Sequence, residues 1–151
     1  MRERICCGFG HRVLLMDLEK PLREVLERLM AERDVRVFYT GGMGEFDELF
    51  ARTVRSMKRE YPSLRLVLVM PYLTERLNMD KMFYESLYDE ILIPAELDSV
   101  HPKAAIGLRN RWMVDHSDFV VAAIHRDFGG AAEAVLYAEE RSKEVLQIFA
   151  E

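Results

Sequence analysis

Cysteine is scarce in this sequence, and the two residues present, Cys6 and Cys7, are adjacent. Adjacent cysteines have neither the spacing of a CxxC redox centre nor that of a metal-ligand set, so they predict neither kind of site. The apolar segment around them, residues 5–10, predicts a buried strand in which both thiols are reduced. Reduced thiols are typical of a reducing compartment, so we expect a cytoplasmic protein.

Long apolar runs are also missing. No stretch approaches the roughly 18 consecutive apolar residues from which a membrane-spanning helix is predicted. The first residues, Met1 to Arg4, lead directly into the predicted strand, without the hydrophobic segment of a signal peptide. The sequence therefore predicts no membrane partner and again favours the cytoplasm.

Positive charge is in deficit. The chain holds 21 Lys and Arg against 26 Asp and Glu, which gives a formal net charge of −5. Proteins that bind nucleic acid without sequence preference ordinarily present a basic face, so we do not expect nucleic acid as a partner. Arg109 and Arg111 still allow a local cationic pocket.

Complete metal and cofactor motifs are absent as well. The four histidines lack the i, i+4 spacing of a helical metal-binding pair; they are His11, His101, His116 and His125. The sequence has no G-x-G-x-x-G motif and no Walker lysine. We therefore predict no metal and no cofactor.

What is present is a regular alternation of apolar segments and helical patterns. Six apolar segments predict strands, at residues 5–10, 35–39, 64–70, 90–94, 118–124 and 145–149. Helical spacing of apolar residues occupies 18–33, 46–60, 103–115 and 131–142, and a short helix is expected over 78–87. With no repeat or linker, residues 1–151 are expected to form a single domain. Alternating strands and helices, with strands apolar throughout, predict a Rossmann-like three-layer α/β sandwich with a mostly parallel sheet.

In such folds ligands bind beyond the carboxyl ends of the strands. The ligand-binding candidates follow three of the strands: Gly10, His11 and Arg12; Thr40, Gly41, Gly42, Gly44, Glu45 and Asp47; and Gly129 and Gly130. Two of these segments are glycine loops that open a helix, where free backbone N–H groups suit a phosphate. Each loop has the alternative of a tight turn without a ligand. Glu45 and Asp47 either accept from ribose hydroxyls or cap the helix.

Three further candidates lie on helices. Either Asn110 or an arginine such as Arg109 reaches over the strand ends to a ribose or phosphate, or this helix face is simply solvated, with Trp112 as its core anchor. Glu133 stands three residues after Gly130, in the first turn of its helix. Its carboxylate either complements the helix dipole or acts on the anomeric carbon of an N-glycoside.

Several of these segments resemble a known family. Gly8 to Arg12, Thr40 to Asp47, and Arg109 to Asp118 followed by Gly129 and Gly130, are similar in content and order to YpsA-like proteins. The whole chain thereby resembles the SLOG superfamily of Rossmann-like domains, which also holds the LOG phosphoribohydrolases and a DNA-processing protein. The resemblance implies a nucleotide or nucleotide-derived ligand at the glycine loops.

The same resemblance bears on catalysis. Neither glycine loop is the intact LOG motif Pro-Gly-Gly-x-Gly-Thr-x-x-Glu. Asp127 to Glu133 is instead similar to the nucleophile loop of nucleoside deoxyribosyltransferases, which implies Glu133 as the catalytic residue. The threonine of that loop is replaced here by Ala131, which removes a hydroxyl.

The sequence thus leads to a ranked set of functions. We expect a module that binds a nucleotide-like small molecule, as a sensor. The alternative is an enzyme that hydrolyses or transfers an N-glycosidic bond with Glu133, and a third alternative is an interaction protein with a vestigial pocket. Self-association is also left open, because the apolar stretch from Met79 to Tyr88 is either an interface or ordinary core.

Overall fold

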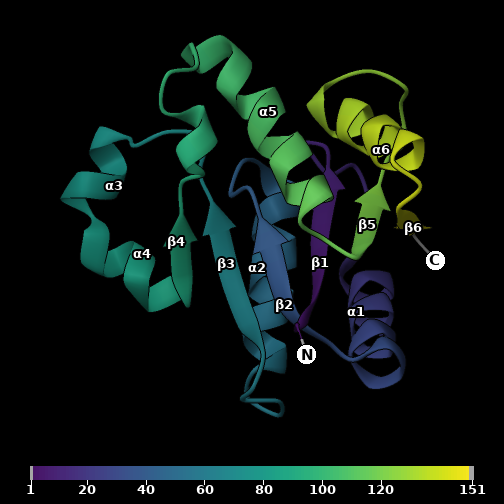
Figure 1. The fold of residues 1–151 in the computed structure, drawn as a ribbon. Coiled ribbons are helices and arrows are strands. Elements are labelled where there is room, and N and C mark those ends of the chain that lie inside the picture. Colours follow the sequence, from purple (N-terminus) through teal and green to yellow (C-terminus); the bar gives the residue numbers. More distant parts are fainter. Residues whose placement is uncertain (1, 150–151) are drawn as a thin grey trace.

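The computed structural model describes residues 2–149, and six strands in this range form one sheet (Figure 1). The strand order is β4-β3-β2-β1-β5-β6, and every pairing between neighbours is parallel. The strands are β1 (Arg4–Gly10), β2 (Val35–Thr40), β3 (Arg65–Val69), β4 (Glu90–Leu92), β5 (Phe119–Ala123) and β6 (Glu144–Gln147). The predicted parallel, Rossmann-like sheet is confirmed.

Helices cover both faces of this sheet and give the predicted three layers. The helices are α1 (Glu19–Arg33), α2 (Glu45–Met57), α3 (Glu75–Met79), α4 (Lys81–Leu87), α5 (Pro102–Asp115) and α6 (Gly130–Glu140), with a single 3-10 turn at Ala95–Leu97. In Figure 1, α1 and α2 lie behind the sheet, α5 and α6 lie in front, and α3 and α4 flank the β4 edge. No helix within residues 2–149 has both the length and the apolar character that crossing a membrane requires.

The central strand β1 is apolar from Ile5 onward, because each of its faces is buried against a different helical layer. Cys6 belongs to the core cluster formed with α1 and α2, whereas Cys7 belongs to the cluster formed with α5 and α6. Both thiols are free and buried. Burial raises the pKa of Cys7 to about 12 and the pKa of Cys6 well above its ordinary value.

The segment between β3 and β4 differs most from expectation. The predicted single helix over 78–87 is two short helices, which meet at Asp80. Thr74 begins the first of them, because its hydroxyl oxygen accepts a hydrogen bond from the Leu77 amide at 3.1 Å. Met79 and Met82 are 82% and 85% exposed, so these two residues are not core. The other alternative for this stretch, an interface, stays a prediction.

The sheet has one position where the strand order reverses. The chain moves outward from β1 through β2, β3 and β4 on one side, and through β5 and β6 on the other. The loops that leave β1 and β5 therefore turn to opposite faces, and a crevice opens between the strand ends. This switch point positions the site described below.

The core on the α1 and α2 side generates a stability prediction. Phe38 on β2 is fully buried, and its ring meets that of Phe50 on α2 edge-on with centroids 6.2 Å apart. Truncation of such a ring leaves a cavity, so Phe38→Ala is expected to lower the free energy of unfolding by about 3–5 kcal/mol in urea titrations. Phe83→Ala on α4, where the ring is 56% exposed, is the control and is expected to change it by about 0.5 kcal/mol at most. Equal losses in the two variants would contradict this account of the core.

Candidate functional site

A pocket of about 560 Å³ lies at the switch point, between the carboxyl ends of β1 and β5 and the helices α5 and α6. It brings together nine of the residues predicted from the sequence: Gly10, His11, Arg12, Asp47, Arg109, Asn110, Gly129, Gly130 and Glu133. Five further predicted residues do not line it: Thr40, Gly41, Gly42, Gly44 and Glu45. The predicted segments after β1 and β5 thus meet in the pocket, whereas most of the segment after β2 does not reach its lining.

The second glycine segment braces the loop after β1. The Glu45 amide donates to the Arg12 carbonyl at 2.8 Å, and the Glu45 carboxylate accepts from the Leu14 amide at 3.2 Å. Gly44 has a φ of 100°, and a Cβ there would lie 2.7 Å from the Arg12 Cα. Only glycine fits this position, because it tolerates both the left-handed backbone and the close approach. The start of α2 therefore holds Arg12 in place.

Gly10 is also required by packing. A Cβ at Gly10 would lie 2.2 Å from the Cγ of Phe46, whose ring is fully buried on α2. Thr40, at the start of the second segment, is buried as well, and its hydroxyl accepts from the Gly42 amide at 3.4 Å. Gly10 thus has a packing role, and Thr40 stabilises the turn after β2.

Arg109 on α5 is a buried cation that joins this helix to two strand ends, those of β2 and β3. Its Nη1 donates to the carbonyls of Gly41 at 3.1 Å and Val69 at 2.8 Å, and its Nε donates to the Asn110 side-chain oxygen at 2.9 Å. Its Nη2 contacts the Met43 sulfur at 3.2 Å. Burial lowers the pKa of Arg109, and the charge of Asp47 opposes that shift. Most of the guanidinium is thus occupied with the protein's own atoms.

Asp47 is the carboxylate beside this cation. Its side chain accepts a hydrogen bond from the Met43 amide at 2.8 Å, which fixes the turn before α2. Burial raises the pKa of Asp47 to about 6, although the Met43 amide and Arg109 both act in the opposite direction. Burial thus penalises the ionised form, so this carboxyl takes up a proton at a higher pH than an exposed aspartate does.

Two histidines join the loops at the switch point. The His125 amide donates to Nε2 of His11 at 3.2 Å, and the two rings meet edge-on with centroids 4.3 Å apart. Burial, followed by the charges of His125 and Arg126, lowers the pKa of His11, so the buried ring stays neutral at pH 7. Within residues 2–149, no three His, Cys, Asp or Glu side chains are grouped to hold a metal ion.

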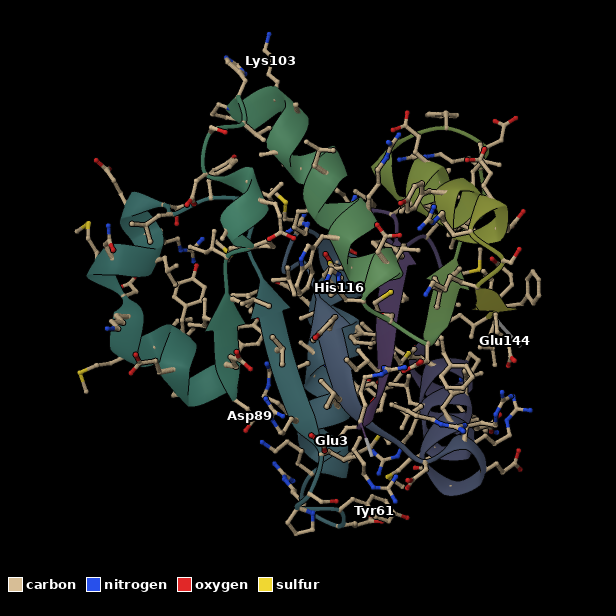
Figure 2. All side chains as sticks on the ribbon, in the orientation of Figure 1. Glu3, Tyr61, Asp89, Lys103, His116 and Glu144 are labelled. Atoms are coloured by element: carbon tan, nitrogen blue, oxygen red, sulfur yellow. The ribbon has the colours of Figure 1, made fainter. Side chains whose placement is uncertain are left out.

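The pocket is cationic in a chain that is acidic overall. Five cationic side chains line it, namely Arg12, Lys103, Arg109, Arg111 and Arg126, against the two carboxylates of Asp47 and Glu133. Figure 2 places Lys103 at the end of α5 that extends past the strand ends, and His116 at the opposite end of that helix. Lys103 and Arg126 were not predicted as site residues; for Arg126 the available signal was its position directly after the fifth strand.

The start of α6 forms one wall of the pocket. Gly129, with a φ of 99°, precedes the helix, and no side chain caps the backbone N–H groups there. Glu133 is in the first turn as predicted, exposed, with its amide bonded to the Gly129 carbonyl at 3.0 Å. A carboxylate here complements the helix dipole.

The Arg109 hydrogen bonds generate a second prediction. Arg109→Lys keeps the charge but removes the planar fork that serves Gly41 and Val69 together, so the free energy of unfolding is expected to fall by about 2 kcal/mol or more. Arg111→Lys, at an exposed position two residues further along α5, is the matched control, with an expected change within about 0.5 kcal/mol. Urea unfolding measures both. If Arg109→Lys unfolds at the same urea concentration as the wild type, the hydrogen bonds of Arg109 to Gly41 and Val69 are not needed for stability.

Asp47 generates a pH prediction. A folded-state pKa of about 6, above the ordinary 3.8, means that the folded protein holds an extra proton, so stability falls as pH rises through this interval. Asp47→Asn cannot ionise, so its stability relative to wild type is expected to rise between pH 4 and pH 7, by at most about 3 kcal/mol. Denaturant titrations across that pH range measure the difference. A constant difference between the two proteins would contradict the raised pKa.

Comparisons with known proteins place the fold. No protein-family model matches the sequence. The uncharacterized SPbeta prophage-derived protein YoqJ of Bacillus subtilis (strain 168) is 25% identical over 141 residues, which covers 83% of this chain and 82% of that protein.

Two solved structures are similar in fold. The DNA processing protein A (DprA) of Streptococcus pneumoniae superposes with a TM-score of 0.71 at 14% identity, covering 96% of this chain and 50% of that one. The DNA processing protein A of Helicobacter pylori, described with a single-stranded DNA binding mode, gives 0.68 at 18% identity, covering 95% of this chain and 64% of that one. The chain thus spans less than two thirds of either neighbour's length. The likeness shows that this chain shares its Rossmann-like fold with both neighbours.

These neighbours correct two expectations. The predicted nucleotide-ligand sensor, with its alternative of N-glycosidic bond chemistry at Glu133, is wrong, and so is the exclusion of nucleic acid as a partner. The finding that overturns both is the likeness to DNA processing proteins, one of them described as binding single-stranded DNA. The physical reason lies in the charge argument: a net charge of −5 sums over the whole chain, whereas the pocket gathers five cations locally.

Proposed function

We propose that this protein binds single-stranded nucleic acid across the pocket at the switch point. The observation that carries the proposal is the excess of cationic side chains over carboxylates lining this pocket in an otherwise acidic chain. Phosphate contacts supply most of the affinity of proteins for single strands, and cations that line a groove are the groups that make them.

The pocket contains two kinds of cation. Arg109 is buried, and its guanidinium is occupied with the carbonyls of Gly41 and Val69. It therefore acts as a positioning residue for the ends of β2 and β3. Arg12, Lys103, Arg111 and Arg126 are exposed and line the same pocket, so they contact the phosphates. The uncapped N–H groups at the start of α6 add partial positive charge next to Gly129 and Gly130.

The other predicted site residues fit this role in part. Gly10, His11 and Asn110 line the pocket beside the cations, and Asn110 contributes an amide side chain. The net charge of −5 repels nucleic acid from the rest of the surface, which favours a strand held at this one place.

Two finer assignments belong to this proposal. The motif from Gly8 to Arg12 supports placement in the YpsA-like branch of the SLOG fold. The two free, buried cysteines suit a reducing compartment, so we propose that the protein works in the cytoplasm.

Binding is tested with a fluorescent oligothymidine of about 12 nucleotides, a length within the usual range of single-strand sites. Fluorescence anisotropy is expected to show binding that weakens as salt rises. Arg12→Ala and Arg126→Ala are each expected to lower affinity about threefold to tenfold. Each is also expected to reduce the slope of log affinity against log salt by about 0.7 for every phosphate that the variant no longer neutralises.

The matched control is Arg28→Ala, an exposed arginine on α1 in the opposite helical layer. This variant removes the same charge, so its affinity and salt slope are expected to equal those of the wild type. An equal loss of affinity in all three variants would show diffuse charge attraction instead of a site. Absence of binding at low salt would overturn the proposed function.

A further inference from the structure

The two loops at the switch point share a pattern of cations followed by exposed apolar side chains. We define the switch-point loops as residues 11–18, after β1, and residues 124–129, after β5. In the first, Arg12 precedes Leu15, whose side chain is 73% exposed; in the second, Arg126 precedes Phe128, which is 63% exposed. The loops are adjacent because His11 and His125 bond at their base.

Phe128 is the aromatic member of this pattern. Neither buried cluster of residues 2–149 includes it, so its ring has no share in the core. It stands between Arg126 and Gly129, which both line the pocket, and the Arg126 guanidinium lies 4.7 Å from its ring centroid. Single exposed apolar residues are ordinary on protein surfaces. Phe128 differs from such residues because its ring contacts Arg126, a cation of the pocket lining that lies two residues earlier in the same loop.

This arrangement suits an unpaired base. In a single strand each phosphate is followed by a base whose flat face is free to stack on an aromatic side chain, with arginine adding a cation–π contribution. In a duplex the same faces are covered by neighbouring base pairs. An aromatic ring beside a phosphate-binding cation therefore distinguishes single strands from duplexes, which cations alone do not.

We infer that Phe128 stacks on an unpaired base whose neighbouring phosphate contacts Arg126, and that this stacking makes the protein prefer single-stranded over double-stranded nucleic acid. The inference rests on the proposed function and adds a specificity-determining residue beside the same pocket, in the loop that contributes Arg126 and Gly129 to its lining. It assigns the phosphates to cations such as Arg126 and the base to the Phe128 ring, so an experiment can separate the contribution of charge from the contribution of stacking.

The experiment measures anisotropy of three labelled probes with the full chain: an oligothymidine of about 12 nucleotides, an abasic strand of equal length, and a duplex. Phe128→Ala is expected to lower affinity for oligothymidine about fivefold to 100-fold, with the salt slope unchanged, because every phosphate-binding cation is still present. Its affinity for the abasic strand and the duplex is expected to match that of the wild type. Phe128→Trp is expected to restore binding to oligothymidine.

The control is Phe83→Ala, which removes a similarly exposed ring on α4, at the other edge of the sheet. It is expected to bind all three probes like the wild type. Circular dichroism of each variant checks that the fold is retained.

The outcomes separate the two proposals. If the wild type binds oligothymidine and Arg12→Ala weakens it, but Phe128→Ala behaves like Phe83→Ala, the stacking inference alone fails. If Phe128→Ala lowers the salt slope or weakens the abasic strand as much as oligothymidine, Phe128 only positions Arg126, and the inference is again overturned. If the wild type binds none of the probes, both proposals fail.

Discussion

The guanidinium of Arg109 makes the hydrogen bonds on which the geometry of the strand ends depends. The β2–α2 turn, the end of β3 and the middle of α5 are far apart in the sequence, and sheet pairing does not fix the turn or the helix. The planar guanidinium of Arg109 extends from α5 and donates hydrogen bonds to carbonyls of both the β2–α2 turn and the end of β3. The turn that it holds then braces Arg12 through Glu45, so a residue that is mostly occupied with the protein itself still decides where an exposed cation stands.

The net charge of the chain and the charge of the pocket have opposite signs, and the composition reports only the first. Acidic residues outnumber basic ones over the chain, but the basic ones that face the switch point are gathered there from segments that are distant in the sequence. No short window of sequence contains this cluster, because Arg12 and Arg126 come from loops more than 100 residues apart that meet only when β1 and β5 pair. When a site is assembled from distant loops, an argument from the net charge of the whole chain therefore leads to the wrong conclusion about its partner.

The sequence predicted the layers well, since alternating apolar segments and helical periods report burial directly. It predicted the strand ends that meet, because glycine and polar residues follow β1 and β5. It did not distinguish glycines near a ligand from glycines required by packing: Gly10 accommodates Phe46, and Gly44 accommodates Arg12. That distinction depends on the distance between a strand and the helix above it, which a local pattern does not contain. For the same reason the sequence left the stretch from Met79 to Tyr88 open as interface or core, because an apolar residue at a helical period has no mark of whether a partner faces it.

The burial of Cys6 and Cys7 in the central strand gives the molecule an internal chemical reporter. Only a thiolate reacts readily with alkylating reagents, and both thiols hold raised pKa values while enclosed between the helical layers. The folded protein therefore behaves toward such reagents as a cysteine-free chain, and one cysteine added at the surface carries a label selectively. Slow modification of the native pair, in turn, reports the opening of the helical layers, because α1 and α2 cover Cys6 and α5 and α6 cover Cys7.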